Sequence, residues 1–466
     1  MKLNSKEIFQ TFILAIGVFL FVLDLFILNV SLPRIQNALH ITNADGQWII
    51  ILYIMGYASL LINAGKAGER FGRKKLYVLG MLGFTLSSLI CGMAINMFTL
   101  LAGRLMQGIS AGLMVPQGIA LLTLSFPDLH KRTRALGIYG SVAGIASVLG
   151  QLLGGILPDQ KWLEEGWRLI FLVNIPIGAL AIFATLIFIA KDAAIPTIKL
   201  GYKAMVQLFL LLVLLLFPLV VGPELHWPLG LMLLFVLALI LLFRFFKTQK
   251  KLFQQNLQPM LNFELFKNRS FTLGLGIALA YYMVQDSYFI INSNYLQMVR
   301  NFSSTATGIA FVYQGIGYVL ASIIAGSLIQ KYGKVVLLSG LAIMLSTLLL
   351  HLFIMDAYPV PVEYLHGLFF GYGLGCGTVL PALMTLALRS LDPSLIGVGS
   401  AVYLTVQQIA ICLGVVFVVG SYYHGEESVF WGFSLLSAAY AQAIVFMMFL
   451  LTLVIYGILR FYSAKK

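Results

Sequence analysis

Long apolar runs alternate with short clusters of polar and charged residues along the whole chain. A helix needs about 20 predominantly apolar residues to cross the hydrocarbon of a bilayer. By that criterion the pattern predicts fourteen membrane-spanning helices. They are expected near residues 8–32, 46–64, 76–95, 97–124, 135–157, 168–190, 204–222, 228–246, 270–297, 305–330, 334–355, 362–388, 396–421 and 433–460.

The distribution of basic residues between these runs predicts their orientation. Cytoplasmic loops of membrane proteins carry an excess of Lys and Arg. If the N-terminus is inside, 25 of the 30 basic residues fall on the cytoplasmic side. Arg34, Lys161, Arg168 and Arg300 remain outside, and Arg104 lies within a span. We therefore expect both termini to be cytoplasmic.

Composition supports an integral membrane protein. The chain is 60% hydrophobic and 10% charged, with a mean hydropathy of +0.95. A water-soluble fold could not bury so many apolar residues. The net charge of +13 does not indicate nucleic-acid binding, because the basic residues lie in short clusters between apolar runs. The first apolar run contains Asp24 and lacks a small-x-small cleavage site, so we expect it to remain as the first span. The three cysteines lie inside apolar runs without metal-ligand spacing, and no cofactor is predicted.

A basic segment at residues 65–76, Gly-Lys-Ala-Gly-Glu-Arg-Phe-Gly-Arg-Lys-Lys-Leu, separates the second and third spans and is predicted to be a tight hairpin at the membrane surface. Residues 326–334 form a degraded copy of it, so spans 1–6 and 9–14 align as two halves. Spans 7 and 8 have no counterpart in this alignment. They are Leu-rich and almost free of polar residues, which suits a lipid-exposed insert. The predicted domains are therefore a six-helix bundle at 1–190, an insert with a cytoplasmic linker at 191–268, and a second six-helix bundle at 269–466.

Three ionisable residues lie within predicted spans, namely Asp24, Arg104 and Asp286. Each costs several kcal/mol to insert, roughly 3 on translocon scales, so each is a functional candidate. Asp24 and Asp286 both lie about 16 residues, or roughly 24 Å, into equivalent spans of the two halves. We expect them to face a shared cavity, where Asp24 exchanges a proton. Arg104 lies at a similar depth, which permits an ion pair with Asp24. The alternatives are a purely structural ion pair, or a helix-capping role for Asp286.

Several motifs carry a resemblance to a known family. Residues 65–76 resemble Gly-x-Leu-x-Asp-Arg-x-Gly-Arg-Lys, with Ala67 and Glu69 as departures, and Gly103-Arg104-Leu-Met-Gln107-Gly108 resembles Arg-x-x-Gln-Gly. Residues 23–33, 166–178 and 399–414 are similar to signatures of spans 1, 6 and 13. Together they resemble the major facilitator superfamily, in its fourteen-span drug:proton antiporter branch. This implies an all-α fold of two pseudo-symmetric six-helix bundles plus two extra spans. It also implies a conformational latch at Gly65, Gly68, Glu69, Arg70, Gly72, Arg73 and Lys74.

The fifth span departs from the family pattern Gly-x-x-x-Gly-Pro-x-x-Gly-Gly. Gly150, Gln151, Gly154 and Gly155 form the predicted hinge, in which Gln151 replaces the proline. Without the kinking proline, the alternatives to strict antiport are proton leak or another mode of coupling. Alternatively, the glycines alone provide the flexibility.

The predicted cavity lining is aromatic and rich in amides, which suits lipophilic cations through cation–π contacts. The candidate residues are Asn29, Tyr53, Tyr57, Gln107, Tyr282, Gln285, Tyr313, Gln314 and Gln407.

The sequence thus predicts a secondary transporter that exports amphipathic, cationic small molecules by proton antiport through alternating access. The rival is a facilitator or proton symporter for a specific metabolite or anion. An enzyme is disfavoured because no nucleotide loop, metal motif or nucleophile elbow is present. A receptor would need a larger soluble domain. The expected partners are a small-molecule substrate, protons and the lipid bilayer, without nucleic acid. We expect a monomer in the cell inner membrane.

Overall fold

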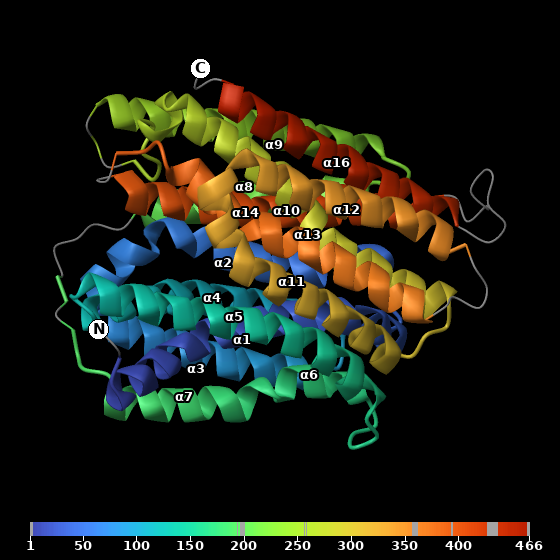
Figure 1. The fold of residues 1–466 in the computed structure, drawn as a ribbon, viewed down its shortest axis with the longest axis horizontal. Helices are drawn as coiled ribbons and strands as arrows, with labels where there is room; N and C mark the ends of the chain where they lie inside the picture. The colour runs from blue at the N-terminus through green and yellow to red at the C-terminus, as the bar shows by residue number, and fades with distance from the viewer. Residues whose placement is uncertain are drawn as a thin grey trace. The chain divides into compact units, whose positions relative to one another are not determined.

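The computed structural model describes residues 3–192, 194–195, 201–255, 257, 259–356, 362–392, 395–425 and 437–463. Regular structure in these residues is helical, as the apolar runs predict (Figure 1). The first residues of the predicted last span, 433–436, lie outside the described part. The chain divides into two compact units, Met1–Leu261 and Asn262–Lys466.

The described residues of the first unit form nine α-helices. In it α1 packs against α5, α4 packs against both α2 and α3, and α7 packs against α3. The bounds are α1 Ser5–Leu39, α2 Asn43–Phe71, α3 Arg73–Gly92, α4 Met97–Ser125, α5 Leu129–Ile156, α6 Leu169–Leu172, α7 Asn174–Phe188, α8 Tyr202–Val221 and α9 Leu229–Gln254, with short 3₁₀ turns at Leu157–Asp159 and Gly166–Arg168.

The second unit repeats this kind of helix packing. Here α13 packs against α11 and α12, and α10 packs against α14 and α16. The helices are α10 Arg269–Asn294, α11 Ser304–Tyr332, α12 Lys334–Ile354, α13 Val362–Leu388, α14 Ile396–Gly414, α15 Gly420–Tyr423 and α16 Ala438–Ser463. A 3₁₀ turn lies at Leu265–Lys267, and π-helical turns follow α10 at Tyr295–Val299 and α14 at Val415–Val419.

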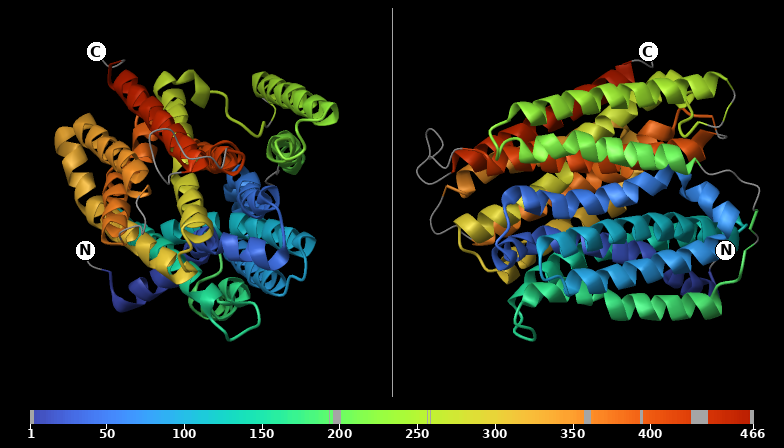
Figure 2. Two further views of the ribbon diagram at one scale, coloured as in Figure 1. Left: turned by 90° about the vertical axis from the view of Figure 1, so that its right-hand side faces the viewer. Right: turned by 180° about the vertical axis from the view of Figure 1, so that it is seen from behind.

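Thirteen helical segments among the described residues are long and apolar enough to cross a membrane. Helix α10 is not among them although it has 26 residues, because it carries polar groups such as Gln285, Asp286 and Asn292. Those polar groups are almost fully buried within the protein. Helices α8 and α9 are the opposite case, with 22% and 11% of their most apolar windows buried, and they lie side by side in Figure 2.

Close helix packing in both units depends on glycines. A Cβ at Gly108 of α4 would lie 2.1 Å from the Tyr53 carbonyl oxygen of α2. In the second unit, a Cβ at Gly373 of α13 would lie 2.0 Å from the Gln314 carbonyl oxygen of α11. Both distances are far inside van der Waals contact. The same glycine-to-carbonyl contact therefore occurs in the helix pairs α2–α4 and α11–α13, as an internal repeat would produce.

Two local features differ from the expected outlines. The basic segment 65–76 is almost entirely helical, because α2 continues to Phe71 and α3 begins at Arg73. The reversal is confined to Gly72, whose φ of +89° is a conformation that favours glycine. The predicted sixth span is divided into α6 and α7 at Val173. Pro176 explains the break, since it has no N–H to donate to the carbonyl four residues earlier.

Candidate functional site

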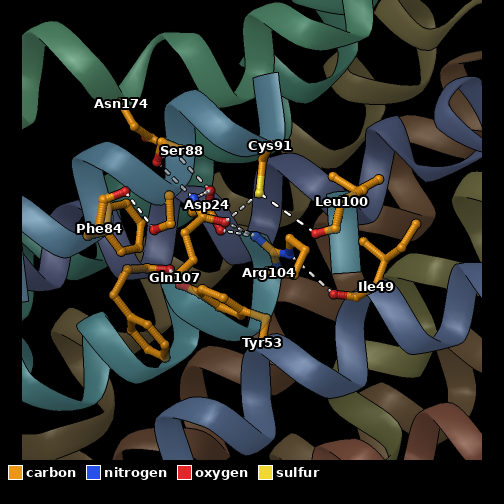
Figure 3. A network of polar contacts seen from close by, with 12 residues as sticks. Asp24, Ile49, Tyr53, Phe84, Ser88, Cys91, Leu100, Arg104, Gln107 and Asn174 are labelled. Carbon is orange, nitrogen blue, oxygen red and sulfur yellow. Dashed lines mark hydrogen bonds and ion pairs between the residues drawn. The ribbon is translucent and has the colours of Figure 1, made fainter. Parts of the chain in front are cut away.

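A buried polar site of the first unit is built around Asp24 of α1, whose side chain is fully buried (Figure 3). Its carboxylate forms an ion pair with the Arg104 guanidinium of α4. Gln107 of α4 and Asn174 of α7 each donate an amide hydrogen bond to Asp24 Oδ1, both at 3.0 Å. Three donors from α4 and α7 therefore satisfy this one buried carboxylate.

Arg104 is also held from several directions. Its Nε donates to the Ile49 carbonyl of α2 at 3.2 Å, and its Nη1 donates to Gln107 Oε1 at 2.9 Å. The Tyr53 ring lies against the guanidinium, with 4.0 Å from Cζ to the ring centroid. Within the described residues, Nη2 has no hydrogen-bond partner. Breaking a buried pair by removing one partner costs about 3–5 kcal/mol, so the two charges depend on each other.

Helix α3 completes the network. Gln107 Nε2 donates to Ser88 Oγ at 2.8 Å, and the Cys91 thiol lies 3.6 Å from Gln107 Oε1. Asn174 Nδ2 also reaches Ser88 Oγ, at 3.4 Å. Asp24 is thus bonded to α4 and α7 and linked through their amides to α3. Removing the Asp24 charge would leave the buried Arg104 charge without its counter-ion.

Close packing of α5 against α1 holds the backbone on either side of Asp24. A Cβ at Gly150 would lie 2.8 Å from the Leu23 carbonyl oxygen, and one at Gly154 would lie 2.4 Å from that of Ile27. Side chains at these positions would therefore push α1 away from α5.

The other two predicted hinge residues lie on the same helix. Gln151 is buried, and its Oε1 accepts no hydrogen bond within the described part of the chain. Gly155 follows Gly154 directly. The hinge itself stays a prediction.

In the second unit, Asp286 of α10 is 4% exposed. It interacts electrostatically with Tyr282, Tyr372 and Cys412. The neighbouring Gln285 Oε1 accepts from the Cys376 thiol at 3.4 Å. The two acids therefore have different surroundings, because Asp24 is paired with a guanidinium whereas Asp286 lies among tyrosines and a thiol.

The remaining cavity candidates are distributed over both units. Asn29 is buried, and neither polar atom of its side chain has a hydrogen-bond partner among the described residues. Tyr57 stacks on Phe21 at 4.2 Å between ring centroids. In the second unit, Tyr313 is 38% exposed and stacks on His366.

Three further candidates belong to the second unit. The Tyr282 and Tyr403 rings meet edge-on at 6.4 Å. Gln314 is buried on α11, and Gln407 is partly exposed on α14. The structure thus brings Tyr53 and Gln107 into the Asp24 network. It places Tyr282 and Gln285 on the same helix as Asp286.

The predicted latch segment has a partner that sequence reasoning missed. Asp192, which follows α7, accepts from the backbone N–H groups of Arg73 at 2.6 Å and Lys74 at 3.0 Å, and so caps the start of α3. In return, Lys74 Nζ donates to the Leu186 and Ile189 carbonyls at the end of α7, at 3.0 and 2.6 Å. The start of α3 and the end of α7 are thereby joined by two reciprocal caps.

The other latch residues support the same turn. Glu69 forms an ion pair with Arg73 at 3.3 Å, and its carbonyl accepts from the Ile195 N–H at 2.7 Å. A Cβ at Gly68 would collide with the Gln117 amide of α4, whereas Gly65 has open space around it. The Arg70 guanidinium lies over the Phe71 ring at 5.3 Å.

Asn174, Ser88, Cys91 and Asp192 are thus the site residues that sequence reasoning missed. Signals for two of them were present. Asn174 lies inside the motif at residues 166–178, and Asp192 is the single acid in the basic stretch 191–203. Within the described residues, no group of His, Cys, Asp and Glu side chains has the arrangement of a metal site.

Comparison with known proteins shows relatives that span most of the chain. A protein named a probable actinorhodin transporter, from Streptomyces coelicolor, is 30% identical over 86% of this chain and 70% of its own length. Multidrug resistance protein Stp of Mycobacterium tuberculosis is 26% identical over 88% of this chain and 75% of its own. Riboflavin transporter RibZ of Clostridioides difficile is 29% identical over 87% of this chain and 86% of its own length.

Solved structures show the same fold at lower identity. A bacterial homologue of the human lysosomal transporter Spinster has a TM-score of 0.65, with 16% identity over 99% of this chain and 98% of its own. A D-xylose–proton symporter also has a TM-score of 0.65, with 13% identity over 97% of both chains. In addition, the sequence profile described as Major Facilitator Superfamily matches residues 14–415. Together with the helical fold and the buried polar site, this shows that the chain belongs to the Major Facilitator Superfamily and is a multi-pass membrane transporter of small molecules, not an enzyme.

Proposed function

We propose that the protein exports amphipathic, cationic small molecules from the cytoplasm in exchange for protons, by alternating access. The proposal includes fourteen spans, with α10 as the ninth, arranged as two six-helix bundles plus α8 and α9. Both termini face the cytoplasm, and the membrane is the bacterial inner membrane. We expect the protein to act as a monomer.

The observation that carries the proposal is the fully buried Asp24 carboxylate and its link to Arg104. A carboxylate at membrane depth costs several kcal/mol to insert, so its presence there marks it as a functional candidate. Here it receives hydrogen bonds from α4 and α7, which lie far apart in sequence. The names of relatives from Streptomyces coelicolor and Mycobacterium tuberculosis, which refer to actinorhodin transport and multidrug resistance, support export as the direction.

Asp24 would act as the proton-binding residue. Because its side chain is fully buried, proton exchange requires the network to open first. When Asp24 is protonated, the Arg104 guanidinium keeps its contacts with Gln107 and the Ile49 carbonyl but loses its counter-ion. The resulting uncompensated charge favours a rearrangement of α1 against α4. Asp286, on the corresponding span of the second unit, would serve as a second proton or cation site.

Transport by everted membrane vesicles tests the proposal. An imposed proton gradient, acidic inside, should drive accumulation of a fluorescent lipophilic cation by the wild type. Asp24→Asn should abolish this accumulation while leaving a folded protein in the membrane, as judged by size-exclusion chromatography after extraction. Asp286→Asn should reduce it.

Glu264→Gln is the matched control, because it converts a solvent-exposed carboxylate into an amide and should transport like the wild type. If Asp24→Asn transports as well as this control, Asp24 has no part in coupling.

A facilitator or proton symporter for a specific metabolite is the second candidate. Gln151 in place of the hinge proline and the similarity to a protein named riboflavin transporter favour it. Adding substrate to vesicles that hold a pH-sensitive dye separates the two candidates. An antiporter exports protons from the vesicle as substrate enters, so the interior becomes more alkaline. A symporter acidifies the interior, and a facilitator leaves it unchanged.

A further inference from the structure

A small apolar cavity lies in the first unit, between the bundle and the first inserted helix. Its volume is about 150 Å³. Asn63, Ala67 and Phe71 of α2 form one wall, and Tyr202 and Met205 of α8 face them. An engineered cavity of this size in another protein binds benzene, so the space is large enough for part of a hydrocarbon chain.

One residue of the cavity lining, Asn63, has an amide N–H without a partner among the described residues. Asn63 is 5% exposed, and its Nδ2 finds no hydrogen-bond acceptor among the described residues. The amide faces the start of α8, since a Cβ at Gly201 would lie 3.9 Å from Nδ2. A buried donor is normally satisfied. The amide therefore indicates a ligand that combines an apolar body with a hydrogen-bond acceptor.

Two exposed aromatic rings line the cavity, and a basic residue lies next to each of them in the sequence. Tyr202 is 60% exposed and Phe71 is 44% exposed. The Arg70 guanidinium lies over the Phe71 ring at 5.3 Å, and the exposed Lys203 follows Tyr202 in the first turn of α8. Exposed aromatic rings with nearby cations are typical of the level at which lipid headgroups meet the hydrocarbon. Basic pockets between membrane helices bind anionic headgroups.

Depth along α2 fits the same interpretation. This helix has 29 residues, or about 43 Å, whereas the hydrocarbon is about 30 Å thick, so its ends extend into the headgroup region. Asn63 lies eight residues, roughly 12 Å, before the end at Phe71. The apolar run of α2 ends one residue later at Ala64 and charged residues begin at Lys66, which places the amide near the boundary where the ester carbonyls of phospholipids are found.

We propose that this cavity is a binding site for an anionic phospholipid. One acyl chain enters between α2 and α8, Asn63 donates to an ester carbonyl, and the phosphate lies near Arg70 and Lys203. The lipid thereby fills the gap beside the small hydrophobic cluster through which α8 contacts Ile62 of α2. The inference does not depend on the proposed direction of transport.

Native mass spectrometry of the purified full-length protein tests the site. Phosphatidylglycerol should bind, and phosphatidylcholine should bind at least tenfold more weakly. Ala67→Phe fills the cavity and should weaken phosphatidylglycerol binding at least tenfold. Ala179→Phe adds the same bulk to an exposed face of α7 and should leave binding unchanged. Equal binding of both lipids, or equal binding by both variants, would overturn the proposal.

The variant Asn63→Leu distinguishes an amide that binds lipid from a buried amide that is simply unsatisfied. Loss of one hydrogen bond should weaken phosphatidylglycerol binding about two- to tenfold. It should also reduce the rise in unfolding temperature that this lipid produces. If Asn63 were merely an unsatisfied core residue, the variant would be more stable with and without lipid and would keep the full lipid-dependent rise. A lipophilic cation that binds here in place of phosphatidylglycerol would also contradict the proposal.

Discussion

Asn174 illustrates how a single side chain contributes to a buried charge. It is one of the two amides that donate to Asp24, and it lies directly after the break between α6 and α7. The break and the amide therefore belong together, since the start of α7 fixes where Asn174 points.

Substituting Asn174 by Leu keeps a similar volume but removes the donor. A hydrogen bond to a charged group contributes about 1.5–3 kcal/mol, so the free energy of unfolding should fall by about that amount. Chemical denaturation in detergent measures it. Asn96→Leu is unsuitable as a control because Asn96 caps α4, whereas Gln254→Leu at the exposed end of α9 is suitable and should change stability little. Equal stability of the Asn174 and Gln254 variants would contradict the assigned hydrogen bond.

Asp128 gives a pH-dependent prediction outside the membrane. It precedes α5 and accepts from the Lys131 backbone N–H at 2.9 Å, which lowers the pKa of its carboxyl below the ordinary value of 3.8. A lowered pKa stabilises the folded protein above the unfolded-state pKa, and this contribution is lost as the pH falls through the folded-state pKa. Asp128→Ala should therefore be less stable than the wild type at pH 7, and the difference in unfolding temperature should shrink below about pH 4. Asp128→Asn keeps a capping acceptor without a charge, so its deficit at pH 7 should be smaller.

At the scale of elements, the reciprocal caps joining α3 and α7 are the clearest departure from what sequence alone suggested. The basic segment 65–76 was predicted, yet its partner Asp192 lies over 115 residues further along the chain. Spacing cannot reveal such a contact, because the fold brings the two segments together. By contrast, the Asp24–Arg104 pair could be anticipated, since counting residues along two spans placed both groups at a similar depth.

Removing the Asp192 cap should destabilise the first unit. Loss of a capping side chain costs about 0.5–2 kcal/mol, and Asp192→Ala should lower the free energy of unfolding by about that amount. Lys74→Met removes the opposite cap and should have a similar effect. Lys75→Met is the control, because Lys75 is exposed and should tolerate the change. A Lys74 variant as stable as the Lys75 variant would show that the second cap contributes nothing.

Two glycines of α5 give a second prediction at the scale of elements. Gly154→Ala forces a methyl group to within 2.4 Å of the Ile27 carbonyl and should lower the free energy of unfolding by about 1–3 kcal/mol. Gly144→Ala lies on the same helix with nothing within 4 Å, and should be neutral or stabilising by up to about 1 kcal/mol. Because the affected carbonyl adjoins the Asp24 segment, Gly154→Ala should also lower vesicle transport more than Gly144→Ala does. Equal stability of the two variants would exclude close packing at Gly154.

For the whole molecule, apolar run length predicted nearly every helix, because bilayer thickness and helical rise fix how many residues a span needs. Run length did not predict where a helix ends or breaks when the backbone chemistry of a single residue decides this. The chain reverses between α2 and α3 at Gly72 alone, and Pro176 divides the sixth span. The direction in which the helices cross the membrane has to be tested separately, because it depends on the membrane rather than on contacts within the protein.

Cysteine labelling tests that orientation. The native cysteines Cys91, Cys376 and Cys412 are at most 2% exposed, so the wild type should react little with maleimide. Arg134 and Lys161 are both exposed; Arg134 lies 22 residues, or about 33 Å, before the end of α5 at Ile156, and Lys161 follows that end. An impermeant maleimide added to intact cells should label Lys161→Cys but not Arg134→Cys, and everted vesicles should give the reverse. Labelling of both from one side would mean that α5 does not span the membrane. If intact cells labelled Arg134→Cys and everted vesicles labelled Lys161→Cys, the N-terminus would lie outside. The protein would then be inverted in the membrane, and export of a cytoplasmic substrate would require protons to cross the Asp24 site in the direction opposite to the one proposed.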